Sequence, residues 1–192
     1  MVCVLFSGGL DSMVLAEKAL QSKRLGCLLH VSYGQRASAQ EYRAALRWAE
    51  ANQAAFKRLI LSVCGLEEMN KEPGKAGARV VPARNLILIS HAVNYAAARG
   101  FKEVWFGACA DDLEDYKDCR PDFVEALDRL TFSASKIRIR APLIDSTKAE
   151  IVAMAKAYEL DLGLTWSCYA PKNDAPCGKC NSCASRLEVS GG

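Results

Sequence analysis

The chain reads Ser7-Gly8-Gly9-Leu10-Asp11-Ser12 directly after the apolar run Val2-Cys3-Val4-Leu5-Phe6. A short apolar run is typical of a buried strand and residues 13–20 are typical of a helix, so the two glycines occupy the turn between them. Because glycine has no Cβ and the first N–H groups of a helix have no partner inside it, the main-chain amides of this turn are expected to be bare. The stretch therefore predicts a strand–turn–helix unit with a phosphate site at its tip.

The spacing of the glycines in this turn excludes two common types of phosphate-binding loop. It lacks the lysine and the spacing of a Walker A loop and is shorter than a dinucleotide fingerprint. The plainer alternative is a glycine turn in which Asp11 or Ser12 caps the helix. The complete string resembles the pyrophosphate loop (PP-loop) of ATP pyrophosphatases, which cleave ATP between its α and β phosphates and pass AMP to a substrate. On that resemblance the nucleotide-binding residues are Phe6, Ser7, Gly8, Gly9, Leu10, Asp11 and Ser12.

Strand-like and helix-like segments alternate along the chain beyond this turn. Strands are expected at 25–32, 56–63, 103–109 and 136–140. Helices are expected from 38, 82, 122 and 147; the pairs Ser38/Glu41 and Thr147/Glu150 predict capping boxes. Pro82 is expected to open the helix that ends near Arg99, with its all-apolar middle, residues 86–89, buried. This alternation predicts an α/β fold with a doubly wound, mainly parallel sheet and right-handed crossovers.

Composition limits the classes of protein that the chain can belong to. It has 192 residues, 51% hydrophobic and 24% charged, with a net charge of +3. No apolar run reaches the roughly 18 residues of a membrane span, and residues 1–6 lack the basic start of a secretion signal, so we expect no membrane partner and a place in the cytoplasm. The small net charge makes nucleic acid an unlikely partner. Nine cysteines, an odd number, argue against a disulfide framework.

Ligands of a doubly wound sheet bind outside the carboxyl ends of the strands. Three loops follow predicted strands and carry polar residues: 7–12, 32–36 and 108–122. We therefore expect these loops to form one site.

Four cysteines crowd near the carboxyl end of the sequence: Cys168, Cys177, Cys180 and Cys183. Two overlapping C-x-x-C units with a fourth thiol upstream suit a closed, tetrahedral zinc site. An iron–sulfur cluster, a redox disulfide or plain surface cysteines are the alternatives. Periodicity ends near Gly163, so we expect a PP-loop domain over residues 1–163 and a small zinc-binding appendage over 164–192.

The motifs together resemble the 7-cyano-7-deazaguanine synthases over nearly the whole chain. They are the hexapeptide 7–12, Tyr33-Gly34-Gln35-Arg36, Arg84-Asn85, Asp118-Cys119-Arg120-Pro121-Asp122-Phe123, Lys148-Ala149-Glu150, and Cys168-Tyr169 with the three later cysteines. The resemblance implies synthesis of 7-cyano-7-deazaguanine (preQ0), the nitrile precursor of queuosine and archaeosine, from 7-carboxy-7-deazaguanine, ammonia and ATP. It also implies one structural Zn²⁺ per chain and a homodimer. The sequence departs from the family in a shorter segment at 65–81 and in Ala83, where a glycine is common.

The resemblance also implies roles for particular residues. The substrate carboxylate would attack the ATP α-phosphate to give an acyl adenylate, which ammonia converts to an amide; a second activation then leads to the nitrile. Mg²⁺ would accompany ATP, with Asp11 as a ligand directly or through water. The catalytic candidates are Lys148, Arg120 and Arg84. The substrate-binding candidates are Tyr33, Gln35, Arg36, Asn85, Asp118 and Asp122.

Plainer interpretations stand beside these roles. Lys148 lies in the first turn of a helix, where a cation opposes the helix dipole, so it is either an exposed lysine or one that meets a phosphate. The arginines could form structural ion pairs, and the acidic loop could simply be solvated. Three other functions also fit: adenylation of a different carboxylate, nucleic acid or protein acceptor; a tRNA-binding thiolation enzyme; or a nucleotide- or zinc-binding interaction module without chemistry.

Overall fold

The computed structural model describes residues 1–64, 81–180, 182–184 and 186. Five parallel strands form one sheet in the order β3-β2-β1-β4-β5. The strands are β1 (Val2–Leu5), β2 (Leu25–Ser32), β3 (Phe56–Ile60), β4 (Glu103–Trp105) and β5 (Arg138–Arg140). The doubly wound parallel sheet expected from the sequence is confirmed, and the predicted strands were too long by a few residues at 56–63, 103–109 and 136–140.

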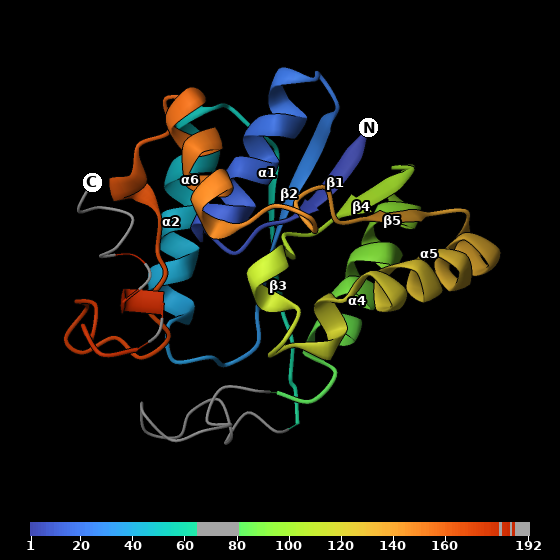
Figure 1. The fold of residues 1–192 in the computed structure, drawn as a ribbon. Coiled ribbons are helices and arrows are strands. Elements are labelled where there is room, and N and C mark those ends of the chain that lie inside the picture. Colours follow the sequence, from blue (N-terminus) through green and yellow to red (C-terminus); the bar gives the residue numbers. More distant parts are fainter. Residues whose placement is uncertain (65–80, 181, 185, 187–192) are drawn as a thin grey trace.

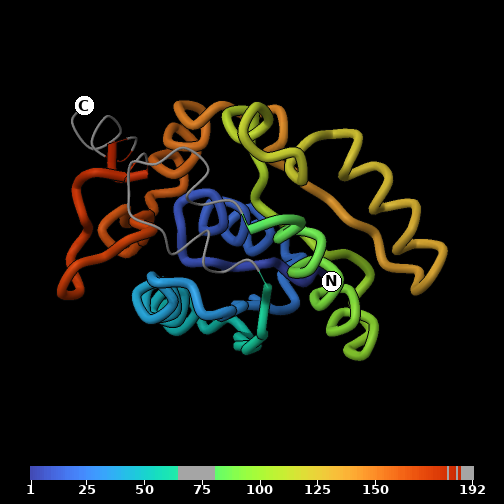
Figure 2. Tube along the Cα trace, turned by 90° about the horizontal axis from the view of Figure 1, so that it is seen from below, coloured from blue at the N-terminus to red at the C-terminus, as the bar shows by residue number. Residues whose placement is uncertain are grey.

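Helices cover both faces of this sheet. They are α1 (Leu10–Gln21), α2 (Ser38–Ala51), α4 (Arg84–Ala98), α5 (Pro121–Ser135) and α6 (Lys148–Ala157). Three short 3₁₀ turns complete the described elements: η1 (Ala110–Asp112), η2 (Lys117–Cys119) and η3 (Leu162–Leu164). Figure 1 shows α1, α2 and α6 on one side of the sheet and α4 and α5 on the other, in agreement with the two separate hydrophobic clusters. The segment that carries the four cysteines lies beside α2, on the side of α6 (Figure 1 and Figure 2).

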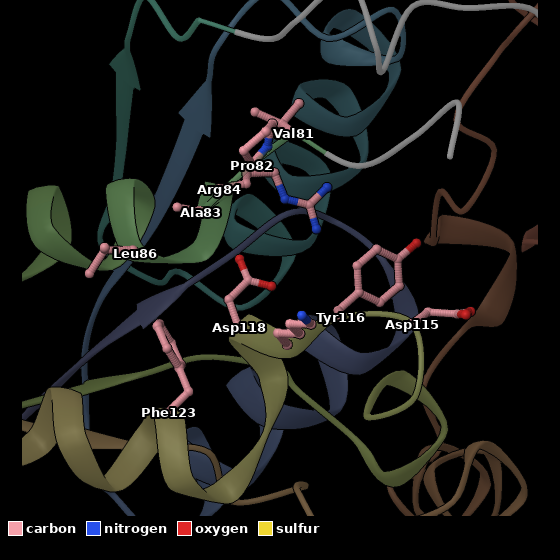
Figure 3. Close-up of a pocket in the computed structure, with 10 residues that line it drawn as sticks. Val81, Pro82, Ala83, Arg84, Leu86, Asp115, Tyr116, Asp118 and Phe123 are labelled. Carbon is pink, nitrogen blue, oxygen red and sulfur yellow. The ribbon is translucent and has the colours of Figure 1, made fainter. Parts of the chain in front are cut away.

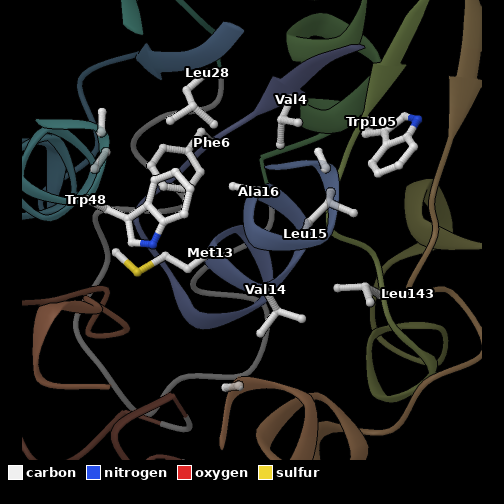
Figure 4. Packing of buried hydrophobic residues seen from close by; sticks show 14 of the residues in the cluster. Val4, Phe6, Met13, Val14, Leu15, Ala16, Leu28, Trp48, Trp105 and Leu143 are labelled. Atoms are coloured by element: carbon white, nitrogen blue, oxygen red, sulfur yellow. The ribbon is translucent and has the colours of Figure 1, made fainter. Parts of the chain in front are cut away.

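The first strand shows why the sequence begins with an unbroken apolar run. Val2 packs into the cluster formed with α1, α2 and α6, as does Val4 (Figure 4). Cys3 packs into the cluster formed with α4 and α5. All three are fully buried. Since both faces of a parallel sheet are covered by helices, its central strands need apolar side chains at every position.

One of the two predicted capping boxes is confirmed and the other is wrong. Thr147 and Glu150 form the expected box at the start of α6, where Thr147 Oγ1 accepts from the Glu150 amide. At the start of α2 the residue that precedes the helix is Ala37, and no side chain caps it. The Glu41 carboxylate instead accepts a hydrogen bond of 2.8 Å from Gln35 Nε2. A side chain from the loop that precedes the helix, six residues away, has therefore replaced the expected cap.

The helix expected from Pro82 also differs from the prediction. It begins at Arg84, because Ala83 adopts a left-handed conformation (φ 53°) that cannot continue a helix. Its middle is only partly buried: Ile89 is fully covered, but Leu86 is 38% exposed. Only the side of α4 with Ile89, Ala92 and Ala96 faces the sheet. The segment at 65–79, expected to be a loop, lies outside the described residues.

Among the described residues, no helix is both long enough and apolar enough to cross a membrane.

Candidate functional site

The strand order places the topological switch point of the sheet between β1 and β4. After β1 the chain crosses to β2 on one side of this point, and after β4 it crosses to β5 on the other side. The loops that follow β1 and β4 therefore lead in opposite directions. Residues 7–12 follow β1 and residues 107–112 follow β4. A Cβ on Gly107 would lie 3.4 Å from the Cβ of Asp11, so the two loops touch. In doubly wound sheets this switch point is the place where ligands bind.

Hydroxyl groups hold the amides of the phosphate loop, residues 7–12. The Gly8 N–H donates to Ser12 Oγ (3.2 Å), and the Gly9 N–H donates to Ser7 Oγ (3.2 Å). Ser12 Oγ itself donates to Gly9 O (2.9 Å) and lies 3.1 Å from Ser7 Oγ. The expectation of bare amides at both glycines is therefore wrong for this structure, because the two serines of the motif supply local partners.

Gly8 is required by two independent constraints. Its φ is +86°, a conformation that side chains rarely adopt. A Cβ at this position would lie 2.6 Å from Glu41 O and 2.9 Å from Ala45 N, both main-chain atoms of α2. The loop therefore packs directly on the backbone of α2, and the first glycine of the motif makes that approach possible.

Lys148 meets Asp11 at the start of α6. The Lys148 Nζ lies 2.6 Å from Asp11 Oδ2, and the Lys148 amide donates to Asp111 Oδ2. Asp11 Oδ1 is buried and has no hydrogen-bond partner among the described residues. Burial raises the pKa of the Asp11 carboxyl, while the charge and hydrogen bond of Lys148 act to lower it. Burial alone would lower the pKa of Lys148, but Asp11 and Asp112 raise it above its ordinary value. Lys148 is therefore a cation held at the phosphate loop.

Asp112 adds a second carboxylate beside this pair. Its Oδ2 accepts from the Cys109 amide (3.3 Å) and from Cys109 Sγ (3.2 Å). Burial, then the charge of Asp112, raises the pKa of Cys109 to about 12, so this thiol stays protonated. The sequence interpretation did not single out Asp112; its place in the loop that follows β4 was the available signal.

A pocket of about 460 Å³ opens between the start of α4 and the loop that contains η2 (Figure 3). Arg84 and Asp118 contribute to its wall together with Tyr116 and Phe123. Arg84 also hydrogen-bonds the hydroxyl of Tyr33, and burial raises the pKa of that hydroxyl to about 12. The pocket thus combines an arginine, a carboxylate and aromatic rings, which suits a flat, polar, anionic ligand.

Two predicted site residues, Asn85 and Arg120, hold the η2 loop of this pocket in place through hydrogen bonds. Asn85 donates from its main chain to Asp118 Oδ2 (2.8 Å) and from its side chain to Cys119 Sγ (3.2 Å). Arg120 Nε donates to Leu113 O (2.8 Å), which braces the loop on the far side of η2. Asn85 and Arg120 therefore hold the loop in place, and Arg120 does so through Nε rather than through its terminal nitrogens.

The Tyr33–Arg36 motif divides into buried and exposed members. Gln35 is 4% exposed; it accepts from the Tyr33 amide (2.8 Å) and donates to Glu41. Burial raises the pKa of Glu41 above its ordinary value, against the effects of Gln35 and Arg84. Arg36 is exposed, as is Asp122, whose Oδ1 accepts from the amide of Phe123. Gln35 thus orders the loop after β2, and Glu41 is a site carboxyl that the sequence interpretation assigned to a cap.

Four sulfur atoms converge in the cysteine segment. The Sγ atoms of Cys168, Cys177, Cys180 and Cys183 all lie within 4.8 Å of one another, and none of the four is in a disulfide. Three of them are buried and Cys177 is half-buried. Burial raises the pKa of the Cys168 thiol above its ordinary value, whereas the hydrogen bond that the Cys177 amide donates to Cys168 Sγ (3.2 Å) acts to lower it. This four-cysteine cluster can hold a single metal ion.

The structure brings the predicted loops to one edge of the sheet. Gln35 donates a hydrogen bond to Glu41, whose main chain packs on Gly8. Arg84 hydrogen-bonds Tyr33 and lines a pocket with residues of the η2 loop. Lys148 reaches the phosphate loop from α6. Arg36 and Asp122 lie at the exposed margin. Which of these side chains bind a ligand stays a prediction.

The whole sequence matches proteins of one family. The family model described as queuosine biosynthesis protein QueC matches residues 1–190. The chain is 35% identical over 200 residues to a 7-cyano-7-deazaguanine synthase of Hahella chejuensis, covering 96% of this chain and 86% of that protein. It is 34% identical over 204 residues to a 7-cyano-7-deazaguanine synthase of Psychromonas ingrahamii, covering 98% and 91%.

A solved structure shares the fold at much lower identity. The U34-tRNA thiolase NcsA of Methanococcus maripaludis, solved with its [4Fe-4S] cluster, matches with a TM-score of 0.62 and 17% identity. The match covers 99% of this chain and 64% of that one. It supports the arrangement of strands and helices described above.

Proposed function

Because the chain belongs to the family of queuosine biosynthesis protein QueC, we propose that it is a 7-cyano-7-deazaguanine synthase. It would use ATP to convert 7-carboxy-7-deazaguanine and ammonia into 7-cyano-7-deazaguanine. The observation that carries this proposal is the Ser7–Ser12 loop at the switch point of the sheet, with the Lys148 cation against it. A second feature that supports it is the pocket whose wall includes Arg84 and Asp118. In this proposal the loop would bind ATP and the pocket would bind the acceptor.

The phosphate loop supplies the first part of the mechanism. The Gly8 and Gly9 amides and the hydroxyls of Ser7 and Ser12 would bind the phosphates, exchanging their present hydrogen bonds for bonds to phosphate oxygens. Lys148 would stabilise the negative charge that grows as pyrophosphate leaves. Donors that are already in place cost little reorganisation when the reaction occurs.

The pocket beside Arg84 supplies the acceptor. The guanidinium would orient the substrate carboxylate, and Asp118 would accept hydrogen bonds from the guanine-like edge. Tyr33 and Tyr116 would cover the flat ring system. Arg120, Gln35 and Asn85 would shape this pocket, with Arg36 and Asp122 at its margin.

The chemistry then proceeds in two activations. The substrate carboxylate attacks the α-phosphorus of ATP, so that pyrophosphate leaves and an acyl adenylate forms. Ammonia attacks the acyl carbon; AMP leaves and a proton is lost, giving the amide. The amide oxygen then attacks the α-phosphorus of a second ATP, so that pyrophosphate leaves and the nitrogen loses one proton. Loss of AMP and of the second proton on that nitrogen gives the nitrile. No nucleophile of the protein is required, which agrees with the high pKa, about 12, of the buried Cys109 and Cys119 thiols.

We propose Zn²⁺ as the ion of the four-cysteine cluster. Four thiolates around one tetrahedral zinc, with Zn–S bonds of about 2.3 Å, hold their sulfurs roughly 3.8 Å apart. The mutual distances within 4.8 Å suit that arrangement, whereas a four-iron cluster would separate the sulfurs further. The zinc would be structural, because all four positions are filled by cysteine.

Mg²⁺ would accompany the nucleotide. Asp11 Oδ1 is buried and has no hydrogen-bond partner among the described residues, so it could bind Mg²⁺ directly or through one of the ion's water ligands. We also propose, from the family resemblance, a homodimer. The absence of a membrane-length apolar run and of a secretion signal in the sequence supports a place in the cytoplasm, and the end of periodicity near Gly163 supports a PP-loop domain over residues 1–163 with the zinc-binding segment over 164–192.

Product analysis tests the function directly. Metal-loaded protein is incubated with ATP, Mg²⁺, ammonium and 7-carboxy-7-deazaguanine, while pyrophosphate is measured by a coupled assay and the base by mass spectrometry. We expect pyrophosphate and AMP only with this acceptor, and conversion of the acid to the nitrile through the amide. Other carboxylates and a tRNA serve as alternative acceptors. Pyrophosphate release with one of these alone, or no release with any, would contradict the proposal.

A further inference from the structure

Trp166 lies between the phosphate loop and the four-cysteine cluster. Its main-chain N–H donates to Gly8 O (2.9 Å), and its carbonyl oxygen lies 3.4 Å from the position of a Cβ on Gly9. Its indole Nε1–H donates to Cys168 O (2.8 Å), the main chain of a cluster cysteine. The ring packs against both the α1/α2/α6 core and the cluster itself. One residue therefore contacts both sites.

Arg186, which follows the last cysteine of the cluster, hydrogen-bonds the chain just before Trp166. It lies three residues beyond Cys183, and its two terminal nitrogens donate to Thr165 O (2.8 Å) and Leu162 O (2.7 Å). The residues just before Trp166 are thus tied to the residues just after the last cluster cysteine. A metal ion held by the four thiolates would restrain the chain on both sides of this segment, and with it the contact of Trp166 with Gly8.

We propose that Trp166 is a positioning residue that couples metal binding at the four-cysteine cluster to nucleotide binding at the phosphate loop. The inference rests on the proposed function, because the loop must bind ATP and the four-cysteine cluster must bind Zn²⁺. The main chain of Gly8 packs on α2, and its carbonyl oxygen accepts a hydrogen bond from the Trp166 N–H. The position of this carbonyl therefore depends on Trp166. Coupling of this kind is reciprocal: if the metal raises the affinity for nucleotide, nucleotide raises the affinity for the metal by the same factor.

The first experiment measures that factor with the zinc-loaded chain. The apparent dissociation constant for zinc is obtained by competition with a chromogenic chelator, with and without saturating Mg²⁺ and α,β-methylene-ATP, which cannot be cleaved at the reacting bond. We expect the analogue to tighten zinc binding at least fivefold, the lower end of couplings between linked sites. An unchanged zinc affinity would overturn the proposal.

Trp166→Phe separates coupling through Trp166 from general stabilisation of the fold. Phenylalanine keeps an aromatic ring and the main-chain N–H but deletes the Nε1–H bond to Cys168 O. We expect the variant to bind the analogue about fivefold more weakly, the usual loss for one hydrogen bond, and to show a smaller effect of the analogue on zinc. If nucleotide protected zinc only because zinc loss unfolds the chain, the effect would be the same in the variant, and the proposal would fail.

Arg43→Gln is the matched control. Arg43 pairs with Asp174, so it also joins the cysteine segment to the body of the protein, but both side chains are more than half exposed and their ion pair does not involve the phosphate loop. Exposed pairs contribute little, so zinc and analogue affinities should match the parent chain. Equal losses in Arg43→Gln and Trp166→Phe would contradict a specific role for Trp166. No binding of analogue by any zinc-loaded protein would overturn the nucleotide site itself, a failure distinct from binding without coupling.

Discussion

Asp11 has two carboxylate oxygens with different surroundings. Oδ2 pairs with Lys148 at 2.6 Å, whereas Oδ1 is buried without a hydrogen-bond partner among the described residues. A pair that served stability alone would be expected to satisfy both oxygens, because an unsatisfied buried acceptor costs about 1–3 kcal/mol. The unsatisfied oxygen and the cation in the first helical turn both point to a ligand at this position.

A double-variant cycle at this pair distinguishes function from structure. Lys148→Met should lower kcat by about 10²–10³-fold, the usual effect of removing one group that stabilises a developing anion. It should also lower the free energy of unfolding, since it leaves the Asp11 carboxylate unpaired. Adding Asp11→Asn should restore much of the stability but none of the turnover. Urea unfolding and pyrophosphate release measure the two effects.

The result that would contradict this prediction is recovery of turnover together with stability in the double variant. Such recovery would make the pair a structural one. Arg129→Gln is a suitable control for loss of a positive charge, because Arg129 and its partner Glu125 are 67% and 71% exposed on α5. It should change neither quantity measurably.

At the scale of elements, the contact between the phosphate loop and α2 depends on glycine. Gly8→Ala would strain a backbone at φ +86° and place a Cβ 2.6 Å from Glu41 O. We expect the free energy of unfolding to fall by about 3 kcal/mol, of which strain at positive φ accounts for roughly 1–2 kcal/mol. Thermal or urea unfolding measures the change.

Gly100→Ala is the matched control for this substitution. Gly100 has φ +74° but nothing within 4 Å of a Cβ, so its replacement measures backbone strain alone. The prediction for Gly8 is wrong if the two alanine variants lose the same stability. A loss of activity after changing Gly8 would therefore not by itself identify a phosphate site, because packing on α2 also changes.

The link between α5 and β5 predicts a dependence of stability on pH. Burial alone would raise the pKa of Asp128, but hydrogen bonds from the Ile139 amide and Arg138, with the charge of Arg140, lower it below its ordinary value. A carboxyl whose folded pKa is depressed stabilises the fold above its unfolded pKa, near 4, and loses that contribution as pH falls through the folded value.

Asp128→Asn should therefore destabilise the protein by about 2 kcal/mol at neutral pH and by less as the pH falls below about 4. Urea unfolding of both proteins between pH 7 and pH 3 measures the difference. Glu125→Gln on the same helix, an exposed residue, should show almost no difference at any pH. A difference for Asp128 that stayed constant down to pH 3 would contradict the assignment.

At the scale of the whole molecule, the cysteine segment packs against the body through Trp166, Arg186 and the Arg43–Asp174 pair. We expect removal of the metal by a chelator to lower the melting temperature by about 10 °C, because metal binding contributes several kcal/mol to folding and 1 kcal/mol corresponds to about 2–4 °C at this chain length. Adding one equivalent of Zn²⁺ should restore it. Metal analysis that found iron and acid-labile sulfide would contradict zinc.

Much of the fold and part of the site followed from local patterns. The apolar run before residues 7–12, the Thr147/Glu150 box and the cysteine spacing each act over a few residues, and each predicted feature is present. The parallel direction of the strands could be predicted too, because alternating strands and helices leave few ways to bury both faces of a sheet. The amide partners of Gly8 and Gly9 were not predicted, although both serines belong to the motif.

Local patterns were sufficient to predict most strands and helices and the convergence of the four thiols, because periodicity and ligand spacing act over a few residues. Two contacts could not be predicted in this way: Lys148 reaches Asp11 from 137 residues away, and Trp166 contacts both the phosphate loop and the four-cysteine cluster. These contacts depend on which helix packs against which loop. Burial then assigns each polar group a partner that spacing along the chain cannot reveal.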